Sequence, residues 1–259
     1  MINLAREASI PVREGAAESA EMGTQMLFGE SCECLEDQGN WWRVRLSLDG
    51  YEGWLNPSML IQIPERIIST IHIWGFVHSG HIQLGDKTMM RLPRGSRFPI
   101  GADGKPMGFA FEGQSWEPAD DLRMMSPMTP EDRVEVAKGY LNTPYLWGGR
   151  SDFGIDCSGL SQNVYRICGM NIPRDSSVQG RFGEEIAFSE RQVGDLAFFR
   201  KENSDRISHV GMLSTMHNLI HASGKVRIDD FSEAGIIHSQ QKKITHHLVC
   251  IRRYLTSIK

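Results

Sequence analysis

The sequence predicts an α+β protein in which two small β-rich domains precede a larger domain with helices first and an antiparallel sheet afterwards. Short β-like segments separated by turn residues fill the first half of the 259-residue chain. A proline-containing junction at 126–129 follows, and helical periodicity begins after it. Strand-like segments return from about residue 193. We therefore expect domains at 1–63, 64–126 and 127–259.

Composition is that of a folded globular protein, with 40% hydrophobic and 23% charged residues. A formal net charge of -4 gives no basic footprint for nucleic acid or for an anionic membrane. No segment has the roughly eighteen apolar residues of a membrane span, and residues 1–10 do not resemble a signal peptide. Five scattered cysteines do not resemble a disulfide framework. We expect a cytoplasmic protein that binds neither nucleic acid nor membrane.

The first region alternates strands and turns closely enough to form a small barrel. Expected strands lie at 24–28, 31–35, 41–46 and 51–55, with turns at 28–30, 37–40 and 49–50. The region contains three tryptophans, Trp41, Trp42 and Trp54, which could pack in the barrel core or stack on a ligand. We favour the core.

A second β region spans about 66–125 and is interrupted by many glycines and prolines. His72, His78 and His81 raise a metal site as an alternative to ordinary surface histidines. Because no cysteines or clustered carboxylates accompany them, a tetrahedral ligand set is incomplete. We expect no metal in this region.

Two helices follow the junction. Thr129 and Pro130 suit the cap and first position of a helix of about a dozen residues that ends near Asn142. A second helix is indicated by apolar residues at helical spacing after Cys157, and Gly169 is placed to end it. Cys157 therefore lies at a helix N-terminus.

A cysteine at a helix N-terminus has two interpretations. Unpaired backbone N–H groups and the helix dipole favour a thiolate, so Cys157 is a candidate nucleophile with a lowered pKa. Most free cysteines are instead small buried apolar residues. Ser158 and Gly159 leave the sulfur approachable, which favours the nucleophile.

Two histidines complete a candidate catalytic set. His209 and His221 occupy strand-like segments on either side of residues 214–217. A hairpin with a three-residue loop would place them on one face, directly opposite or on a diagonal, about 5 to 8 Å apart. A two- or four-residue loop would place them on opposite faces. The same-face arrangement would let His209 accept the thiol proton while His221 orients its ring.

The first region resembles a bacterial SH3-like domain. The resemblance rests on Val12-Arg13, Gln25-Met26-Leu27-Phe28-Gly29-Glu30, Trp42-Arg43-Val44-Arg45 and Asp49-Gly50-Tyr51-Glu52-Gly53-Trp54. The second region is similar by position only and would be a divergent SH3-like domain.

Residues from about 128 to 256 resemble the NlpC/p60 family of cell-wall cysteine peptidases. The motifs that carry the resemblance are Pro144-Tyr145-Leu146-Trp147-Gly148-Gly149, Asp156-Cys157-Ser158-Gly159-Leu160, Pro173-Arg174-Asp175-Ser176, Gly194-Asp195-Leu196, His209-Val210-Gly211 and His221-Ala222-Ser223. The resemblance implies a papain-like fold and a hydrolytic mechanism that needs no cofactor. In the family's terms Cys157 is the nucleophile, His209 the base and His221 its orienting partner, while Tyr145 organises the site. The backbone N–H of Cys157 would contribute to an oxyanion hole.

The arrangement of two SH3-like domains before a peptidase domain resembles that of the subfamily of gamma-D-glutamyl-L-diamino-acid endopeptidases. The resemblance implies a peptidoglycan stem peptide, L-Ala-gamma-D-Glu-diamino acid, as the substrate, with a free amine on its L-Ala. Glu21 would pair with that amine and Tyr51 would line the same pocket. Four residues of the catalytic domain would contribute the rest of the substrate site: Asp156, Ser158, Asp175 and Ser176. A requirement for the free amine implies recycling of released stem peptides inside the cell.

Two other functions remain open. SH3-like domains also tether proteins to cell wall, so the chain is alternatively a non-catalytic wall-binding protein. A similar cysteine triad also serves an N-acetylmuramoyl-L-alanine amidase, which would release sugar rather than a dipeptide.

Overall fold

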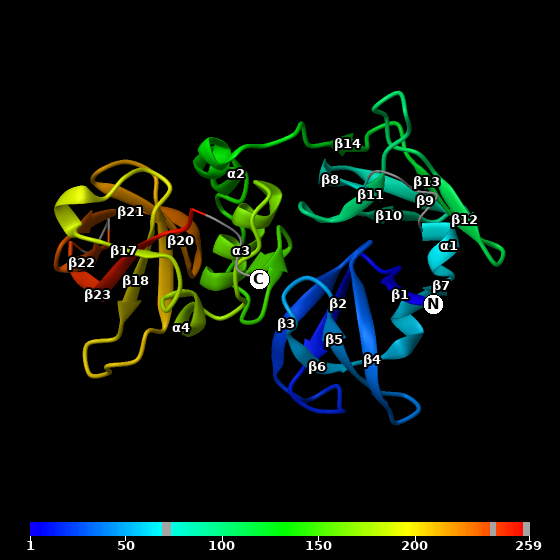
Figure 1. Cartoon of the computed structure of the whole chain (residues 1–259), viewed down its shortest axis with the longest axis horizontal. Helices are drawn as coiled ribbons and strands as arrows, with labels where there is room; N and C mark the ends of the chain where they lie inside the picture. The colour runs from blue at the N-terminus through cyan, green and yellow to red at the C-terminus, as the bar shows by residue number, and fades with distance from the viewer. Residues whose placement is uncertain (69–73, 239–241, 256–259) are drawn as a thin grey trace. The chain divides into compact units, whose positions relative to one another are not determined.

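The computed structural model describes residues 1–68, 74–238 and 242–255 (Figure 1). Its chain forms two compact units, Met1–Ser126 and Pro127–Lys259. The division between them falls in the proline-containing segment at 126–129.

A seven-stranded antiparallel sheet begins the first unit, in the order β3-β2-β6-β5-β4-β1-β7. Its strands are β1 (Ile2–Ala5), β2 (Ser9–Arg13), β3 (Met22–Leu27), β4 (Ser31–Asp37), β5 (Trp42–Leu46), β6 (Glu52–Leu55) and β7 (Leu60–Ile63), with the 3-10 turn η1 (Pro57–Met59) before β7. Ile10, Val12 and Val44 alternate inward and are fully buried, as the two-residue period of a strand requires. The four expected strands are confirmed as β3 to β6, whereas β1, β2 and β7 were not expected.

The predicted turns have the backbone that glycine permits. Gly29, Gly39 and Gly50 all have positive φ, from 73° to 76°. At Gly29 a Cβ atom would also lie 2.3 Å from the Arg97 carbonyl oxygen, so a side chain is excluded there by space as well. Trp42 packs partly buried against the barrel core, which supports a structural use of that ring.

Two small sheets follow, with strand orders β10-β9-β13-β12 and β11-β8-β14. Their elements are α1 (Glu65–Ile68), β8 (Trp74–Ser79), β9 (His81–Leu84), β10 (Met89–Arg91), β11 (Arg97–Pro99), β12 (Phe109–Phe111), β13 (Gln114–Pro118) and β14 (Arg123–Met124). The strands are short because glycines and prolines separate them, as expected for this region.

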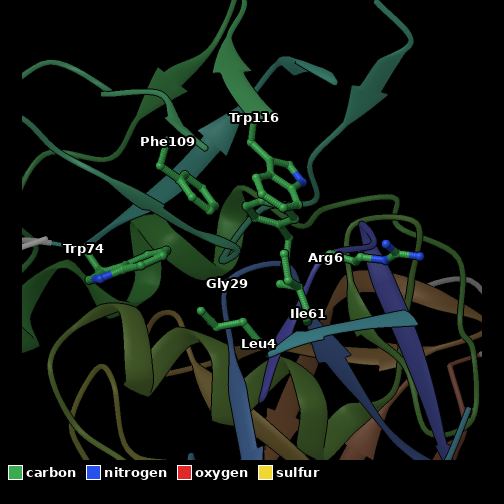
Figure 2. A pocket seen from close by; sticks show the side chains of 9 residues that line it. Leu4, Arg6, Gly29, Ile61, Trp74, Phe109 and Trp116 are labelled. Atoms are coloured by element: carbon green, nitrogen blue, oxygen red, sulfur yellow. The ribbon is translucent and has the colours of Figure 1, made fainter. Parts of the chain in front are cut away.

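The first sheet and the two small sheets share one apolar core, which is why residues 1–126 form a single unit. Phe28 stacks on Phe98 with ring centroids 6.1 Å apart, and the Arg97 N–H donates to the Phe28 carbonyl at 2.9 Å. Figure 2 shows Trp116 above Leu4 and Ile61, in the same cluster. Burial of these side chains on both sides favours a fixed arrangement of the sheets within this unit.

The second unit places its helices first and its sheet afterwards, which confirms the predicted α+β order. Its elements are η2 (Pro130–Asp132), α2 (Arg133–Lys138), β15 (Arg150–Ser151), β16 (Gly154–Ile155), α3 (Cys157–Ile167), α4 (Ser176–Gln179), β17 (Glu184–Ile186), η3 (Phe188–Glu190), β18 (Leu196–Arg200), β19 (His209–Leu213), β20 (Asn218–Ser223), β21 (Lys225–Ser232), β22 (Gly235–Ile237) and β23 (Ile244–Arg253). The main sheet has the order β17-β23-β18-β19-β20-β21-β22. An additional pairing of β22 with β23 closes strands β18 to β23 into a barrel. Helix α3 packs against β19 and β20 (Figure 1).

The first predicted helix is shorter than expected. It starts at the predicted cap, where the Asp132 carboxylate accepts from the Thr129 N–H at 2.8 Å, but α2 ends at Lys138. Asn142 has φ of 69°, and its N–H donates to the Val226 carbonyl at 2.9 Å. The backbone beyond Gly139 therefore serves the barrel rather than the helix.

Candidate active site

Helix α3 begins at Cys157, as predicted, because Asp156 caps it. The Asp156 carboxylate accepts from the Gly159 N–H at 2.7 Å, and its second oxygen accepts from the Gly148 N–H at 2.9 Å. A Cβ on Gly159 would lie 2.3 Å from the Gly149 carbonyl oxygen, so only glycine allows the preceding loop to approach this closely. The cap and the close approach together fix the position of Cys157.

A buried guanidinium neutralises this cap. Arg174 donates to both Asp156 oxygens, at 2.6 and 3.0 Å, and to the Ser158 hydroxyl at 2.8 Å. All three side chains are buried. Because these polar atoms are already paired within the protein, they hold the loop around the nucleophile. Substrate binding by Asp156 and Ser158 stays a prediction.

The two candidate histidines lie on one face of the barrel wall, on a diagonal. Gly211 pairs with His221 in the β19–β20 ladder, so His209 stands two residues along from the directly opposite position. The His209 Nε2 and His221 Nδ1 atoms are 2.8 Å apart. The predicted hairpin with its same-face diagonal pair is therefore what the register of these strands produces.

Asp229 extends this pair by one more strand, and the sequence reasoning missed it. The Asp229 Oδ2 atom lies 3.0 Å from His221 Nε2, and Arg227 donates to the same oxygen. Strand β21, which carries both residues, was not among the expected strands. The sequence contained a signal for it. A tight hairpin centred on Gly224 pairs His221 with Arg227, and Asp229, two residues further along the strand, then lies on the same face as Arg227.

Cys157 lies close to the histidine strand. The backbone N–H of Val210, the residue after His209, donates to the Cys157 sulfur, as does that of Ser158. Burial, followed by the charge of neighbouring Asp156, nevertheless raises the pKa of the Cys157 thiol to about 12. The expected lowering of this pKa is wrong, because desolvation of the thiolate outweighs the helix N-terminus and Arg174.

The histidines are neutral in this environment. Burial lowers the pKa of His209 well below 6.5, and His221 and His246 lower it further. Burial likewise lowers the pKa of His221, against the opposing effect of Asp229. The His246 ring stacks on His209 with centroids 4.3 Å apart. An unprotonated imidazole can accept the proton of a thiol as the sulfur attacks an electrophile, so neutral His209 is suited to act as a base.

Three other predicted residues surround Cys157 or follow its helix. Tyr145 is half-buried, and burial, followed by the charges of Cys157 and Asp156, raises its pKa. Asp175 is exposed and precedes α4, whose first residue, Ser176, is half-buried. Their roles toward a substrate stay predictions.

Glu21, predicted to pair with the substrate amine, and Tyr51, predicted to line the same pocket, belong to the first unit. The Tyr51 hydroxyl donates to the Glu14 carboxylate at 2.8 Å, whereas Glu21 is exposed. Glu14 and Glu21 are neighbours through their backbones, because the Glu14 N–H donates to the Glu21 carbonyl at 2.9 Å. A Cβ on Gly23 would lie 2.2 Å from the Tyr51 hydroxyl oxygen and 2.3 Å from Glu14 Oε1. Glu14 is thus a second candidate that the sequence reasoning did not consider.

The described residues contain no group of three or more side chains arranged to hold a metal ion. His81 instead contacts the Asp121 carboxylate at 2.7 Å, and His78 contacts the Ser79 hydroxyl at 3.1 Å. His72, the third histidine of that alternative, lies outside the described residues. Among the same described residues, no helix is both long and apolar enough to cross a membrane.

Comparison with known families agrees with both resemblances. Residues 142–248 match the NlpC/P60 family, and residues 12–60 match the bacterial dipeptidyl-peptidase Sh3 domain. A gamma-D-glutamyl-L-lysine dipeptidyl-peptidase of Bacillus subtilis is 30% identical over 77% of this chain and 71% of its own length. A protein of the same name from Bacillus cereus is 27% identical over 78% of this chain and 67% of its own.

The fold is also that of a solved structure. An NlpC/P60 family protein from Bacillus cereus superposes with a TM-score of 0.80 at 19% identity, covering 98% of this chain and all of the other. This likeness and the matched domains confirm the predicted fold class, a papain-like NlpC domain preceded by an SH3-like barrel. That residues 64–126 form a second, divergent SH3-like domain stays a prediction. With the matched domains and the 30% identical relative, it follows that the chain belongs to the NlpC/P60 family of peptidases, with a bacterial dipeptidyl-peptidase SH3 domain before the NlpC/P60 domain.

Proposed function

We propose that this chain is a cysteine endopeptidase that hydrolyses the bond between gamma-D-Glu and the diamino acid of a peptidoglycan stem peptide. The observation that carries the proposal is the set of Cys157 at the start of α3 with the 2.8 Å pair of His209 and His221. The names of the two Bacillus relatives support the choice of bond.

The chemistry uses Cys157 as nucleophile and His209 as general base. The thiol proton passes to His209 as the sulfur attacks the gamma-carbonyl carbon of D-Glu. The oxyanion of the tetrahedral intermediate is stabilised by the backbone N–H of Cys157 at the α3 N-terminus. The protonated His209 then donates to the leaving amine of the diamino acid, and a thioester remains.

Water completes the cycle. His209 accepts a proton from the water molecule that attacks the thioester, which releases the dipeptide L-Ala-gamma-D-Glu and regenerates the thiol. His221 holds the His209 ring throughout by the Nε2 to Nδ1 contact. No step in this cycle uses a cofactor.

A free amine on the substrate's L-Ala is the second part of the proposal. A buried ammonium group is stabilised by a carboxylate partner, and Glu21 is proposed as that partner, with Tyr51 lining the same pocket. Tyr145, Ser158 and Ser176 are proposed to contact the peptide. An acylated amine loses its charge and the ion pair, so stem peptides still linked to sugar would be poor substrates. The proposed role is recycling of released stem peptides.

The test is incubation of the full chain with L-Ala-gamma-D-Glu-diaminopimelate, free or N-acetylated, followed by mass spectrometry of the products. Release of L-Ala-gamma-D-Glu from the free peptide alone is the expected result, and the Cys157→Ala variant is the control that must release none. Equal cleavage of both peptides would contradict the amine requirement. Cleavage of neither, together with retention on insoluble murein, would favour a wall-binding protein, and release of sugar from a muropeptide would favour an amidase.

A further inference from the structure

Asp229 continues the catalytic pair by the same geometric step that joins the two histidines. Gly211 pairs with His221 across β19 and β20, and His221 pairs with Arg227 across β20 and β21. His209 and Asp229 each stand two residues from the position directly opposite, so the three side chains follow one diagonal over three strands. All are buried, and Asp229 is only 2% exposed.

The hydrogen bonds along this diagonal have a direction. An ionised carboxylate only accepts, so His221 Nε2 must carry the hydrogen that Asp229 receives at 3.0 Å. A neutral imidazole carries one ring hydrogen, which leaves His221 Nδ1 as an acceptor. The donor to it at 2.8 Å must then be His209 Nε2–H. His209 is left with its lone pair on Nδ1.

Arg227 keeps the carboxylate in its acceptor state. Its Nε and Nη2 atoms lie 2.8 and 2.5 Å from the same Asp229 oxygen that faces His221. A guanidinium remains charged at any pH of interest and stabilises the ionised carboxylate. The oxygen that faces the histidine pair therefore stays unprotonated.

We propose that Asp229 is a positioning residue that sets both histidines in the Nε2–H tautomer, so that His209 offers an unprotonated Nδ1 to the thiol. The inference rests on the proposed function of His209 as the base. It concerns the resting protein, however, and can be measured without any substrate.

A buried ion pair with a purely structural role is the rival explanation, and the same barrel contains a matched example. Asp195, which precedes β18, accepts from Arg253 Nε and Nη2 at 2.8 Å each and is 3% exposed. It also accepts from the Gln192 N–H, and no histidine is among these partners. Substitution of Asp195 thus reproduces the loss of a buried aspartate–arginine pair without touching the histidines.

The charge around the pair is set by groups from several elements. Those that act on the two histidines or on the stacked His246 are Asp229 and Arg227 from β21, His246 from β23, His238, and Lys201 after β18. Cys157, on α3, accepts from the backbone N–H of Val210 on β19. Asp229 is the anion that opposes the burial of His221, so its removal makes protonation of the pair harder.

The first experiment measures tautomers in the 15N-histidine-labelled full chain at pH 7.5 by long-range 1H–15N correlation. The expected wild-type result is the Nε2–H tautomer for both His209 and His221. In Asp229→Leu the bias is lost, and the pair populates the alternative tautomer with hydrogen on His221 Nδ1. Asp195→Leu keeps the wild-type tautomers. An unchanged His221 spectrum in folded Asp229→Leu would overturn the proposal.

The second experiment measures cleavage against pH and includes Asp229→Asn, whose amide oxygen can still accept from His221 while the charge is gone. We expect kcat to fall about 10- to 100-fold in Asp229→Leu and less in Asp229→Asn. The acid limb of kcat/KM in Asp229→Asn should move to lower pH, since protonation of the pair is harder. An acid limb of Asp229→Asn that superimposes on the wild type, or that Asp195→Asn shifts equally, would overturn the proposal even if Asp229→Leu fails to fold.

The two proposals fail in different ways. Wild-type tautomers as expected, with no cleavage of the stem peptide, would remove the proposed function and leave the role of Asp229 intact. Cleavage as expected with unchanged tautomers in Asp229→Leu would do the reverse.

Discussion

The candidate site has a helix side and a barrel side that use buried charge differently. On the helix side, Arg174 donates to both carboxylate oxygens of Asp156, and Asp156 also accepts from the Gly148 N–H. These hydrogen bonds hold the loop around Cys157. On the barrel side, Asp229 is hydrogen-bonded to the neutral imidazole of His221, which in turn is hydrogen-bonded to that of His209, the proposed base. The first arrangement fixes a position, and the second fixes where protons reside. Substitutions on the two sides should therefore fail in different measurements.

The largest effects are expected on the barrel side and should appear in the rate. His209→Ala removes the base and should lower kcat by about 10³- to 10⁴-fold, while His221→Gln, which can still contact the ring, should lower it less. Stopped assays on the free tripeptide, with circular dichroism to verify folding, would measure both. A His221→Gln variant as slow as His209→Ala would show that the two histidines are not separable into base and orienting partner.

A substitution on the helix side should appear first in stability. Arg174→Met leaves the buried Asp156 carboxylate without its guanidinium and should cost about 3–5 kcal/mol of unfolding free energy. Arg45→Met, which breaks an exposed pair with Glu52 at 2.8 Å, is the control and should leave the unfolding free energy nearly unchanged. Denaturant unfolding compares them. A loss in Arg174→Met no larger than that in Arg45→Met would contradict the structural role of the Arg174–Asp156 pair.

The barrel side also makes stability depend on pH. His209, His221 and His246 have pKa values below that of a free histidine, and burial lowers the pKa of His246 to about 4. Their neutral state stabilises the fold above about pH 6.5, and this contribution is lost as pH falls toward 4, because the unfolded chain then binds protons that the folded chain excludes. We expect Tm to fall by roughly 3–10 °C between pH 7 and pH 5.

His246→Phe tests this dependence because it keeps a ring over His209 and removes one titrating group. The decrease in Tm between pH 7 and pH 5 should become smaller in that variant. A decrease of the same size would mean that other groups determine the acid sensitivity.

The smallest expected effect concerns choice of substrate. Glu21→Gln should reduce the preference for the free over the N-acetylated tripeptide by about 10-fold, with little change in rate on the acetylated one. Glu14→Gln is the matched comparison, since Glu14 is the acid that contacts Tyr51. Loss of preference in Glu14→Gln alone would transfer the proposed amine partner from Glu21 to Glu14.

Local pattern was enough to predict the helix at Cys157 and the shared face of His209 and His221. Both depend on short-range rules, a cap and a hairpin loop, which act over a few residues. The length of the first helix was wrong because the backbone at Asn142 pairs with Val226, which is distant in sequence. The predicted lowering of the Cys157 pKa was wrong for a similar reason, because the residues that bury the thiol are not revealed by the local sequence pattern. Asp229 was missed with strand β21, although the hairpin centred on Gly224 leads to it.

The pairing of β22 with β23 has a consequence for how the enzyme matures. Strand β23 closes the barrel because it pairs with β18 at one edge and with β22 at the other, and the strands that carry His209, His221 and Asp229 lie between those two edges. A nascent polypeptide that stops before β23 contains Cys157, His209 and His221 yet lacks the strand that closes the barrel. Hydrolytic activity should thus emerge late and in a single step during synthesis or refolding, with no partly active intermediate.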